Sequence, residues 1–137
     1  MLDVSKARRV FHSGQPDEKI ALDGLDLKLD TGDFAVVIGS NGAGKSTLLN
    51  AISGALTLDS GKVFINGADV TSIPVHRRAI HVARVFQDPM KGTAATMTVA
   101  ENMLLADLPP NPASLRRGLS KDRRDFYAEQ LSYLHLG

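Results

Sequence analysis

The stretch "GSNGAGKSTLL", residues 39–49, decides the fold that we expect for the N-terminal part of this 137-residue chain. The segment before it, "FAVVI" at residues 34–38, is apolar at every position and is typical of a strand covered on both faces. Apolar residues recur at helical spacing after Lys45, and Gly54 stands where that helix would end. The apolar face of the helix consists of Leu48, Leu49, Ile52 and Ala55. The predicted order is therefore strand, glycine loop, helix.

The glycine loop fits the pattern G-x-x-x-x-G-K-[ST], in which each fixed position has a role in binding phosphate. Glycines let the backbone pass close to phosphate oxygens, so that N–H groups at the start of the helix point at the anion. Lys45 would add a charge at the β and γ phosphates, Ser46 would bind Mg²⁺, and Thr47 would donate to the α phosphate. The predicted nucleotide-binding residues of the loop are Gly39, Ser40, Asn41, Gly42, Ala43, Gly44, Lys45, Ser46 and Thr47.

The glycine loop allows two other interpretations. A glycine-rich turn without a ligand is the simplest, but a buried strand before the loop and an amphipathic helix after it are the surroundings that the phosphate-binding pattern requires. A dinucleotide site is disfavoured because Gly39, Gly42 and Gly44 do not have the G-x-G-x-x-G spacing.

The segments around this unit read mainly as strands. The expected strands are "ARRVFH" (residues 7–12), "IALDGLDLKL" (20–29), "SGKVFINGADV" (60–70) and "HVARVFQ" (81–87). In the second of these, Leu25, Leu27 and Leu29 alternate with polar residues at the period of a half-buried strand. The third contains an Asn-Gly turn signal, and a polar stretch follows it at residues 76–78.

Two helices are expected toward the C-terminus. Thr98 with Glu101 three residues later is a capping-box signature for a helix over "VAENMLLADL", residues 99–108. A second amphipathic helix is expected over residues 122–136. Its apolar side would consist of Phe126, Tyr127, Leu131 and Leu134.

The composition narrows the class of protein. Sixteen Lys and Arg against fifteen Asp and Glu give a formal net charge of +1, which points to no nucleic-acid partner. The chain has no cysteine, which excludes disulfides and thiolate metal sites and fits a reducing cytosol. No apolar run is long enough for a membrane span, and the charged N-terminal segment argues against a signal peptide. We therefore expect a cytoplasmic protein.

Two further stretches, "SGKVFINGADVT" (60–71) and "ARVFQDPMKGTAATMTVAENMLLA" (83–106), suggest a family. Together with the glycine loop they resemble the ATP-binding subunits of ABC transporters, and the resemblance runs from Val10 over essentially the whole chain. Residues 32–56 and the "TVAENMLLAD" segment are similar to prokaryotic import systems for amino acids, including the tryptophan/tyrosine type. The resemblance implies ATP and Mg²⁺ as ligands and ATP-driven solute transport as the activity.

The resemblance also implies roles for residues outside the loop. Gln87 matches the Q-loop glutamine, which in the family contacts Mg²⁺ or the attacking water, so Gln87 and Lys45 are the catalytic candidates. A solvated loop glutamine is the alternative. Phe11 matches an aromatic residue that stacks on adenine, and an ordinary core phenylalanine is its alternative. Apolar residues after the Q-loop would form a docking surface for a transmembrane subunit, although at helical spacing they are more often core. These are Met97, Val99 and Met103.

The implied fold is α/β: a P-loop NTPase core with an antiparallel β subdomain at the N-terminus and the start of an ABC-type helical subdomain. We expect a partial ATP-binding domain over residues 1–137. The β subdomain and P-loop core through the Q-loop would occupy residues 1–90, and the helical subdomain would begin in residues 91–137. The implied partners are ATP, transmembrane permease subunits and a second ATP-binding subunit, with no nucleic acid. The implied location is the cytoplasm, at the inner face of the cell membrane through the permease subunits.

Three motifs of the family are missing from the sequence. These are a signature loop of LSGGQ type, a Walker B strand ending in Asp-Glu, and a switch histidine; "GLSKD" at residues 118–122 is no signature loop. Without the glutamate, an attacking water lacks its expected base. We therefore expect a truncated domain that binds ATP weakly, hydrolyses it negligibly, and exposes strand edges that favour aggregation or pairing. The alternatives are a soluble ABC-type ATPase in DNA repair or translation, and a non-hydrolytic nucleotide-binding fragment.

Overall fold

The computed structural model describes residues 1–108 and 118–134 of the chain. They belong to two compact units, Met1–Ala83 and Arg84–Gly137. The glycine loop and every strand formed by the described residues lie in the first unit, and Gln87 lies in the second.

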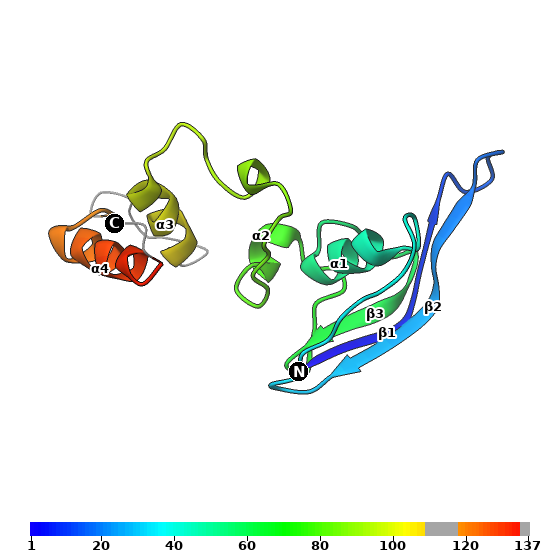
Figure 1. Ribbon diagram of the computed structural model, residues 1–137. Coiled ribbons are helices and arrows are strands. Elements are labelled where there is room, and N and C mark those ends of the chain that lie inside the picture. Colours follow the sequence, from blue (N-terminus) through cyan, green and yellow to red (C-terminus); the bar gives the residue numbers. More distant parts are fainter. Residues whose placement is uncertain (109–117, 135–137) are drawn as a thin grey trace. The chain divides into compact units, whose positions relative to one another are not determined.

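The first unit is built on a four-stranded antiparallel sheet in the order β2-β1-β3-β4 (Figure 1). The strands are β1 (Leu2–Phe11), β2 (Lys19–Leu29), β3 (Ser60–Ile65) and β4 (Ala68–Asp69). Along β2, Leu25, Leu27 and Leu29 are half-buried and the residues between them are exposed. The predicted alternation is therefore confirmed, as are the strands expected at residues 7–12 and 20–29. The segment expected as one strand at 60–70 is divided into β3 and β4 by a turn at residues 66–67.

A β-bulge at Lys6 explains why β1 buries both Val4 and Ala7, which are three positions apart. The pairing with β2 shifts register between these two residues, and Lys6 has a φ of 49°. Asp26 of β2 accepts the Lys6 ammonium at 2.6 Å and its backbone N–H at 2.7 Å, and these hydrogen bonds lower the pKa of the Asp26 carboxyl. The core cluster that results contains Val4, Ala7, Leu22, Leu48, Val63, Ile65 and Val70.

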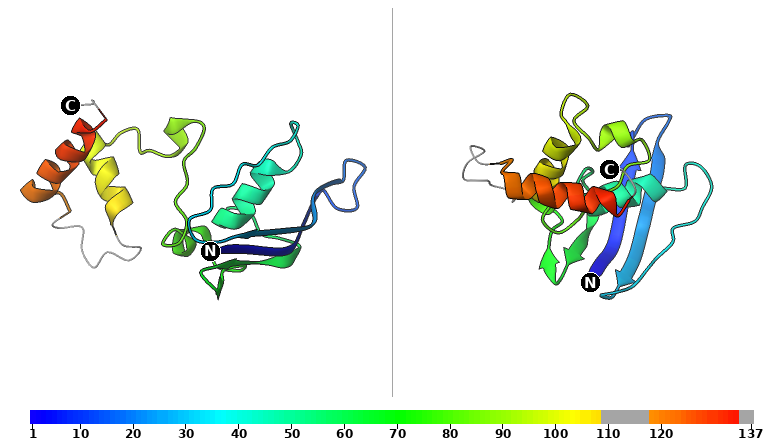
Figure 2. Two further views of the ribbon diagram at one scale, coloured as in Figure 1. Left: turned by 60° about the horizontal axis from the view of Figure 1, so that its bottom comes forward. Right: turned by 60° about the vertical axis from the view of Figure 1, so that its left-hand side comes forward.

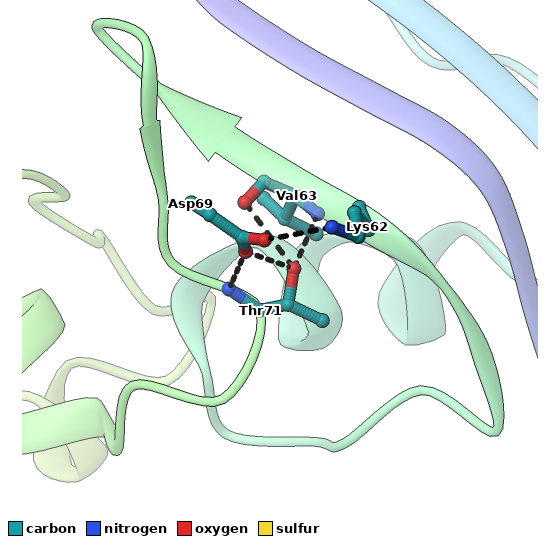
Figure 3. A network of polar contacts seen from close by, with 4 residues as sticks. All are labelled: Lys62, Val63, Asp69 and Thr71. Carbon is teal, nitrogen blue, oxygen red and sulfur yellow. Dashed lines mark hydrogen bonds and ion pairs between the residues drawn. The ribbon is translucent and has the colours of Figure 1, made fainter.

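Thr71 holds the β3–β4 hairpin together (Figure 3). The Asn-Gly turn at residues 66–67 has positive φ at both positions, as a two-residue hairpin turn requires, so the turn prediction is confirmed. The Thr71 hydroxyl accepts the Val63 N–H at 2.9 Å and donates to the Asp69 carboxylate at 2.6 Å. Lys62 Nζ lies 3.3 Å from the same carboxylate. The hydrogen bonds from Thr71, and then Lys62, hold the pKa of Asp69 below its ordinary value.

Helix α1 (Lys45–Ser53) covers one face of the sheet, as Figure 1 and Figure 2 show from different sides. It buries Leu48 against the strand residues and ends at Gly54, where the sequence predicted its end. The predicted apolar face is only partly buried, because Leu49 is 50% exposed and Ala55 lies exposed beyond the helix. Successive residues point 100° apart, so Leu49 leaves the face that Leu48 and Ile52 present to the sheet.

Arg78, at the end of the short helix α2 (Val75–Arg78), is only 2% exposed. The sequence predicted no more than a polar stretch here. The guanidinium donates to five backbone carbonyls, those of Ala51 at 2.6 Å, Ile52 at 2.9 Å, Thr71 at 3.1 Å, Ile73 at 3.0 Å and Val70. The first two belong to the last turn of α1, where a cation also interacts favourably with the helix dipole. Burial lowers the pKa of Arg78.

The strands predicted at residues 34–38 and 81–87 were wrong, because neither segment forms a strand. Phe34 and Ile38 are 90% and 89% exposed, and Val85 is 96% exposed. A strand exists only where its N–H and C=O groups pair with those of a neighbour. Within the described ranges, no segment pairs with either stretch. An apolar sequence indicates that a segment tends to be buried. Burial itself requires a neighbouring segment that pairs with it or packs against it.

The second unit contains the one-turn helix η1 (Pro89–Lys91) and the helices α3 (Val99–Asp107) and α4 (Lys121–Ser132). The predicted capping box at the start of α3 is confirmed. The Glu101 carboxylate accepts the Thr98 N–H at 2.7 Å, and the Thr98 hydroxyl accepts the Glu101 N–H at 3.3 Å. These hydrogen bonds from Thr98 lower the pKa of Glu101.

Helices α3 and α4 lie side by side (Figure 1 and Figure 2). Tyr127 of α4 is buried, and its hydroxyl donates to the Asp107 carboxylate of α3 at 3.0 Å. The predicted apolar side of α4 is otherwise largely exposed, with Phe126 at 52% and Leu134 at 65%. The helix ends at Ser132, earlier than predicted, and residues 135–136 of that prediction lie outside the described ranges. None of the helices that the structure describes has the length and apolar character that a membrane crossing requires.

Candidate nucleotide-binding site

The glycine loop rests against the first residues of β2. Gly44, the residue before α1, has a φ of 87°, and a Cβ at this position would collide with the carbonyl oxygen of Ala21. The same hypothetical Cβ would lie 3.5 Å from a methyl carbon of Leu22. Only glycine combines this left-handed conformation with so close an approach, so the second glycine of the motif is required by the local backbone. The contact fixes where α1 begins relative to the sheet.

The start of α1 is a set of backbone donors with no side-chain cap. Lys45, Ser46 and Thr47 form the first turn, whose N–H groups have no acceptor within the helix. No side chain caps this end, and the first turn carries no acidic residue. The N-terminal end of a helix carries about half a unit of positive charge. The residues present therefore fit an anion, and a phosphate group would satisfy the unpaired donors.

Lys45 extends back across the loop that precedes it. Its ammonium donates to the carbonyl oxygens of Gly39 at 2.6 Å and Ser40 at 2.7 Å. These two hydrogen bonds tie the lysine side chain to the start of the loop. Within the loop, the Ala43 N–H donates to the Ser40 carbonyl oxygen at 3.2 Å. The charge predicted to meet phosphate is therefore at the loop and not directed away into solvent.

Phe11, the predicted adenine platform, ends β1 in the same unit and is half-buried. The guanidinium of Arg9 lies 5.2 Å from the centroid of its ring, which is within cation–π range. Asp59 holds this arrangement, since it accepts Arg9 at 2.8 Å and the Val10 N–H at 2.6 Å. Arg9 thus occupies one face of the Phe11 ring. Stacking of a base on the opposite face stays a prediction.

The remaining predicted residues lie in the second unit. Gln87 is exposed, in a bend before η1. Its role toward Mg²⁺ stays a prediction. Met97 and Val99, at the start of α3, are 45% and 61% exposed, and Met103 is half-buried. These apolar side chains are not core residues of the described unit, and the partner that would cover them stays a prediction too.

Two features of the site were missed by reading the sequence. Ala21 offers the backbone against which Gly44 packs, and Lys19 approaches the loop at Gly42, where a Cβ would lie 2.9 Å from Lys19 Nζ. The sequence does contain an indication of the position of Lys19. Gly14 and Pro16 mark a turn, and residues 11 and 19 on either side of it would pair in a hairpin. The structure pairs these two residues.

The loop, the helix start and the sheet beneath them define the class of protein as a P-loop nucleotide-binding fold. A family model described as "ABC transporter" matches residues 22–136. The chain belongs to the ABC transporter family.

Relatives and solved structures agree with this assignment. A tyrosine transport ATP-binding protein of Clostridioides difficile is 39% identical over 106 residues, which is 77% of this chain and 42% of the relative. A probable branched-chain amino acid transport ATP-binding protein, LivG of Methanocaldococcus jannaschii, is 38% identical over 69% of this chain and 37% of the relative. The structure of MJ1267, an ATP-binding cassette of an ABC transporter, aligns with a TM-score of 0.74 at 29% identity and covers 99% of this chain.

The chain spans only part of the proteins that it matches. It covers 54% of the MJ1267 cassette, including in the ADP conformation of that protein, where the TM-score is 0.75. The dimeric cassette MJ0796 aligns with a TM-score of 0.77 at 23% identity, which supports the fold alone. The family and the fold are therefore shown, for about half the length of the solved cassettes.

Proposed function

We propose that this chain forms the nucleotide-binding part of an ATP-binding subunit of an ABC transporter, which binds ATP with Mg²⁺ to drive the movement of a solute across a membrane. The observation that carries the proposal is the uncapped start of α1 with Lys45 folded over residues 39–44. Unpaired backbone donors, a helix dipole and a full positive charge converge there, and a chain of phosphates is the ligand that uses all three.

Contacts with the nucleotide can be assigned to the second half of the loop and to the first turn of α1 by their chemistry. Backbone N–H groups of residues 42–47 would bind phosphate oxygens, and Lys45 would exchange its two carbonyl acceptors for phosphate oxygens. The Ser46 hydroxyl would be a ligand of Mg²⁺, with Gln87 as a second candidate. Among the described residues no three His, Asp or Glu side chains form a metal cluster, so phosphate oxygens and water would supply the other ligands. When bound, Mg²⁺ neutralises charge on the β and γ phosphates.

The proposed partners are inferred from the names of related proteins and from exposed apolar residues at the start of α3. Relatives of this chain are named as transport ATP-binding proteins for tyrosine and branched-chain amino acids, so we propose an amino acid or similar small solute as the cargo. A transmembrane permease subunit would dock on the apolar residues Met97 and Val99 at the start of α3. A second ATP-binding subunit would pair with this one at the cytoplasmic face of the membrane.

The test is calorimetric titration of the chain with ATP, with and without Mg²⁺, while phosphate release is followed in the same samples. We expect saturable binding that Lys45→Ala weakens by about 10-fold or more, because hydrogen bonds to charged groups contribute about 1.5–3 kcal/mol. Lys28→Ala is the matched control, since Lys28 is an exposed lysine at the far end of β2 from the loop.

Two outcomes would contradict the proposal. If a sample that circular dichroism shows to be folded does not bind ATP, the proposal of a nucleotide-binding site is refuted. Equal binding by wild type and Lys45→Ala would remove the assigned role of the loop. We also expect negligible hydrolysis, and a turnover of about 1 s⁻¹ or more, the low end for ordinary enzymes, would refute that part.

A further inference from the structure

We propose that Lys19 is a second cation of this site, which binds phosphate oxygens of the nucleotide from the β1–β2 side of the loop. The inference rests on the proposed function and adds a residue that lies outside the glycine-loop motif. It is carried by three independent observations: strand register, approach to the loop, and the availability of the charge.

Strand register places Lys19 beside the predicted base platform. Phe11, the last residue of β1, pairs with Lys19, the first residue of β2, across the antiparallel ladder. Side chains of directly opposed residues project from the same face of a sheet, about 5 Å apart at Cβ. A base that stacked on Phe11 would therefore have the Lys19 side chain next to it.

The loop passes along the start of β2 at two successive points. Gly44 meets the Ala21 carbonyl, and two residues earlier Gly42 faces Lys19, whose Nζ lies 2.9 Å from the position that a Cβ on Gly42 would occupy. Residues 19 and 21 of β2 thus run beside residues 42 and 44 of the loop. This places the Lys19 ammonium beside the middle of the phosphate-binding motif.

The charge of Lys19 is available for a ligand. The carboxylates nearest to it in sequence already have partners, because Asp17 contacts His12 Nδ1 at 2.5 Å and Glu18 accepts the Gly14 N–H at 2.7 Å. Lys6 and Lys62, in the same unit, are paired with Asp26 and Asp69. Among the described residues, no carboxylate lies within ion-pair distance of Lys19.

Phosphate is the part of a nucleotide that this group would recognise. An ammonium is a compact point charge that pairs with phosphate oxygens, whereas adenine and ribose offer it no charge. Lys45 already approaches the loop from the helix side through Gly39 and Ser40. Lys19 would approach from the start of β2, on the other side of the loop. The phosphates would then lie between Lys19 and Lys45.

The experiment measures the affinity of the chain for ATP, adenosine and inorganic tripolyphosphate in wild type, Lys19→Met, Lys19→Gln, Lys45→Ala, Phe11→Ala and the control Lys28→Met. We expect both Lys19 variants to weaken ATP and tripolyphosphate by about 5-fold, the upper range for an exposed ion pair, and to leave adenosine unchanged. The loss should shrink at high salt because exposed charges are screened. Phe11→Ala should weaken ATP and adenosine and leave tripolyphosphate unchanged.

The outcomes separate this inference from the function on which it rests. If Lys45→Ala loses tripolyphosphate affinity and both folded Lys19 variants keep it, Lys19 is not a phosphate ligand and the loop proposal stands. If Lys28→Met weakens binding as much as Lys19→Met, only overall charge matters and the inference is overturned. If the folded wild-type chain binds neither ATP nor tripolyphosphate, the proposed function fails, and the role of Lys19 fails with it.

Discussion

Strand β3 and residues 34–38 have similar apolar sequences and opposite environments. In "VFI" of β3, Val63 is 1% exposed and Ile65 is 7% exposed, whereas Phe34 and Ile38 of "FAVVI" are 90% and 89% exposed. The difference is the neighbour, because β3 is hydrogen-bonded on both sides, to β1 and to β4. Arg78 is the converse case, since a charged side chain is 2% exposed where five carbonyls receive it. Hydrogen-bonding partners decide burial in this chain at least as much as hydropathy does.

The largest test of this comparison is Arg78→Met against Arg77→Met. We expect Arg78→Met to lower the free energy of unfolding by about 3 kcal/mol or more, because it leaves buried carbonyls without a donor. Arg77, one residue earlier, is exposed and should change stability by no more than about 0.5 kcal/mol when replaced. Urea unfolding followed by circular dichroism measures both. Equal effects would mean that the buried guanidinium contributes nothing beyond its charge.

A second test compares the two apolar segments themselves. Val63→Ala in β3 should cost about 2 kcal/mol, since it removes two methyl groups from a packed core. Val36→Ala should cost no more than about 0.5 kcal/mol, because Val36 is 68% exposed. The same urea titration applies. A loss at Val36 as large as that at Val63 would show that residues 34–38 are buried in solution.

A third and smaller test concerns helix α3, which has no fully buried residue and depends on local hydrogen bonds. Thr98→Ala removes the capping box and should destabilise the helix by about 1 kcal/mol, read as faster hydrogen exchange at residues 101–104. Thr96→Ala, at an exposed position before the cap, is the control.

The capping box should also make α3 sensitive to acid. The pKa of Glu101 is lowered by its hydrogen bonds from Thr98, so the stabilisation is complete above the ordinary value of about 4.3. It is lost as pH falls through the lowered pKa, when the carboxylate gains a proton. Hydrogen exchange between about pH 6 and about pH 2, corrected for intrinsic rates, should show this loss in wild type and not in Thr98→Ala. An identical acid response in both would rule out the cap as its source.

The parts of the fold that could be predicted from the sequence are those set by local chemistry. The Asn-Gly turn, the stop at Gly54, the Thr98–Glu101 box and the alternation in β2 each depend on a few adjacent residues, and each is found. The motif of the candidate site was equally local.

The parts that could not be predicted depend on partners distant in sequence. The strands expected at 34–38 and 81–87 required neighbours that the described residues do not supply. The burial of Arg78 required carbonyls from two other segments, and the approach of Lys19 to Gly42 required the hairpin to close first. The spacing of residue types along one segment does not indicate which distant residues that segment will contact.

The contacts of Lys45 with its own loop have a consequence for selectivity. Two of the three N–H donors of the ammonium are bound to the carbonyls of Gly39 and Ser40, so a ligand that takes over these two donors replaces a neutral amide oxygen at each. A phosphate oxygen adds the attraction between opposite charges to the hydrogen bond, whereas a sugar hydroxyl or a ring nitrogen carries no charge to add. For these two donors the carbonyls compete with an uncharged ligand on nearly equal terms, and an anion has the advantage.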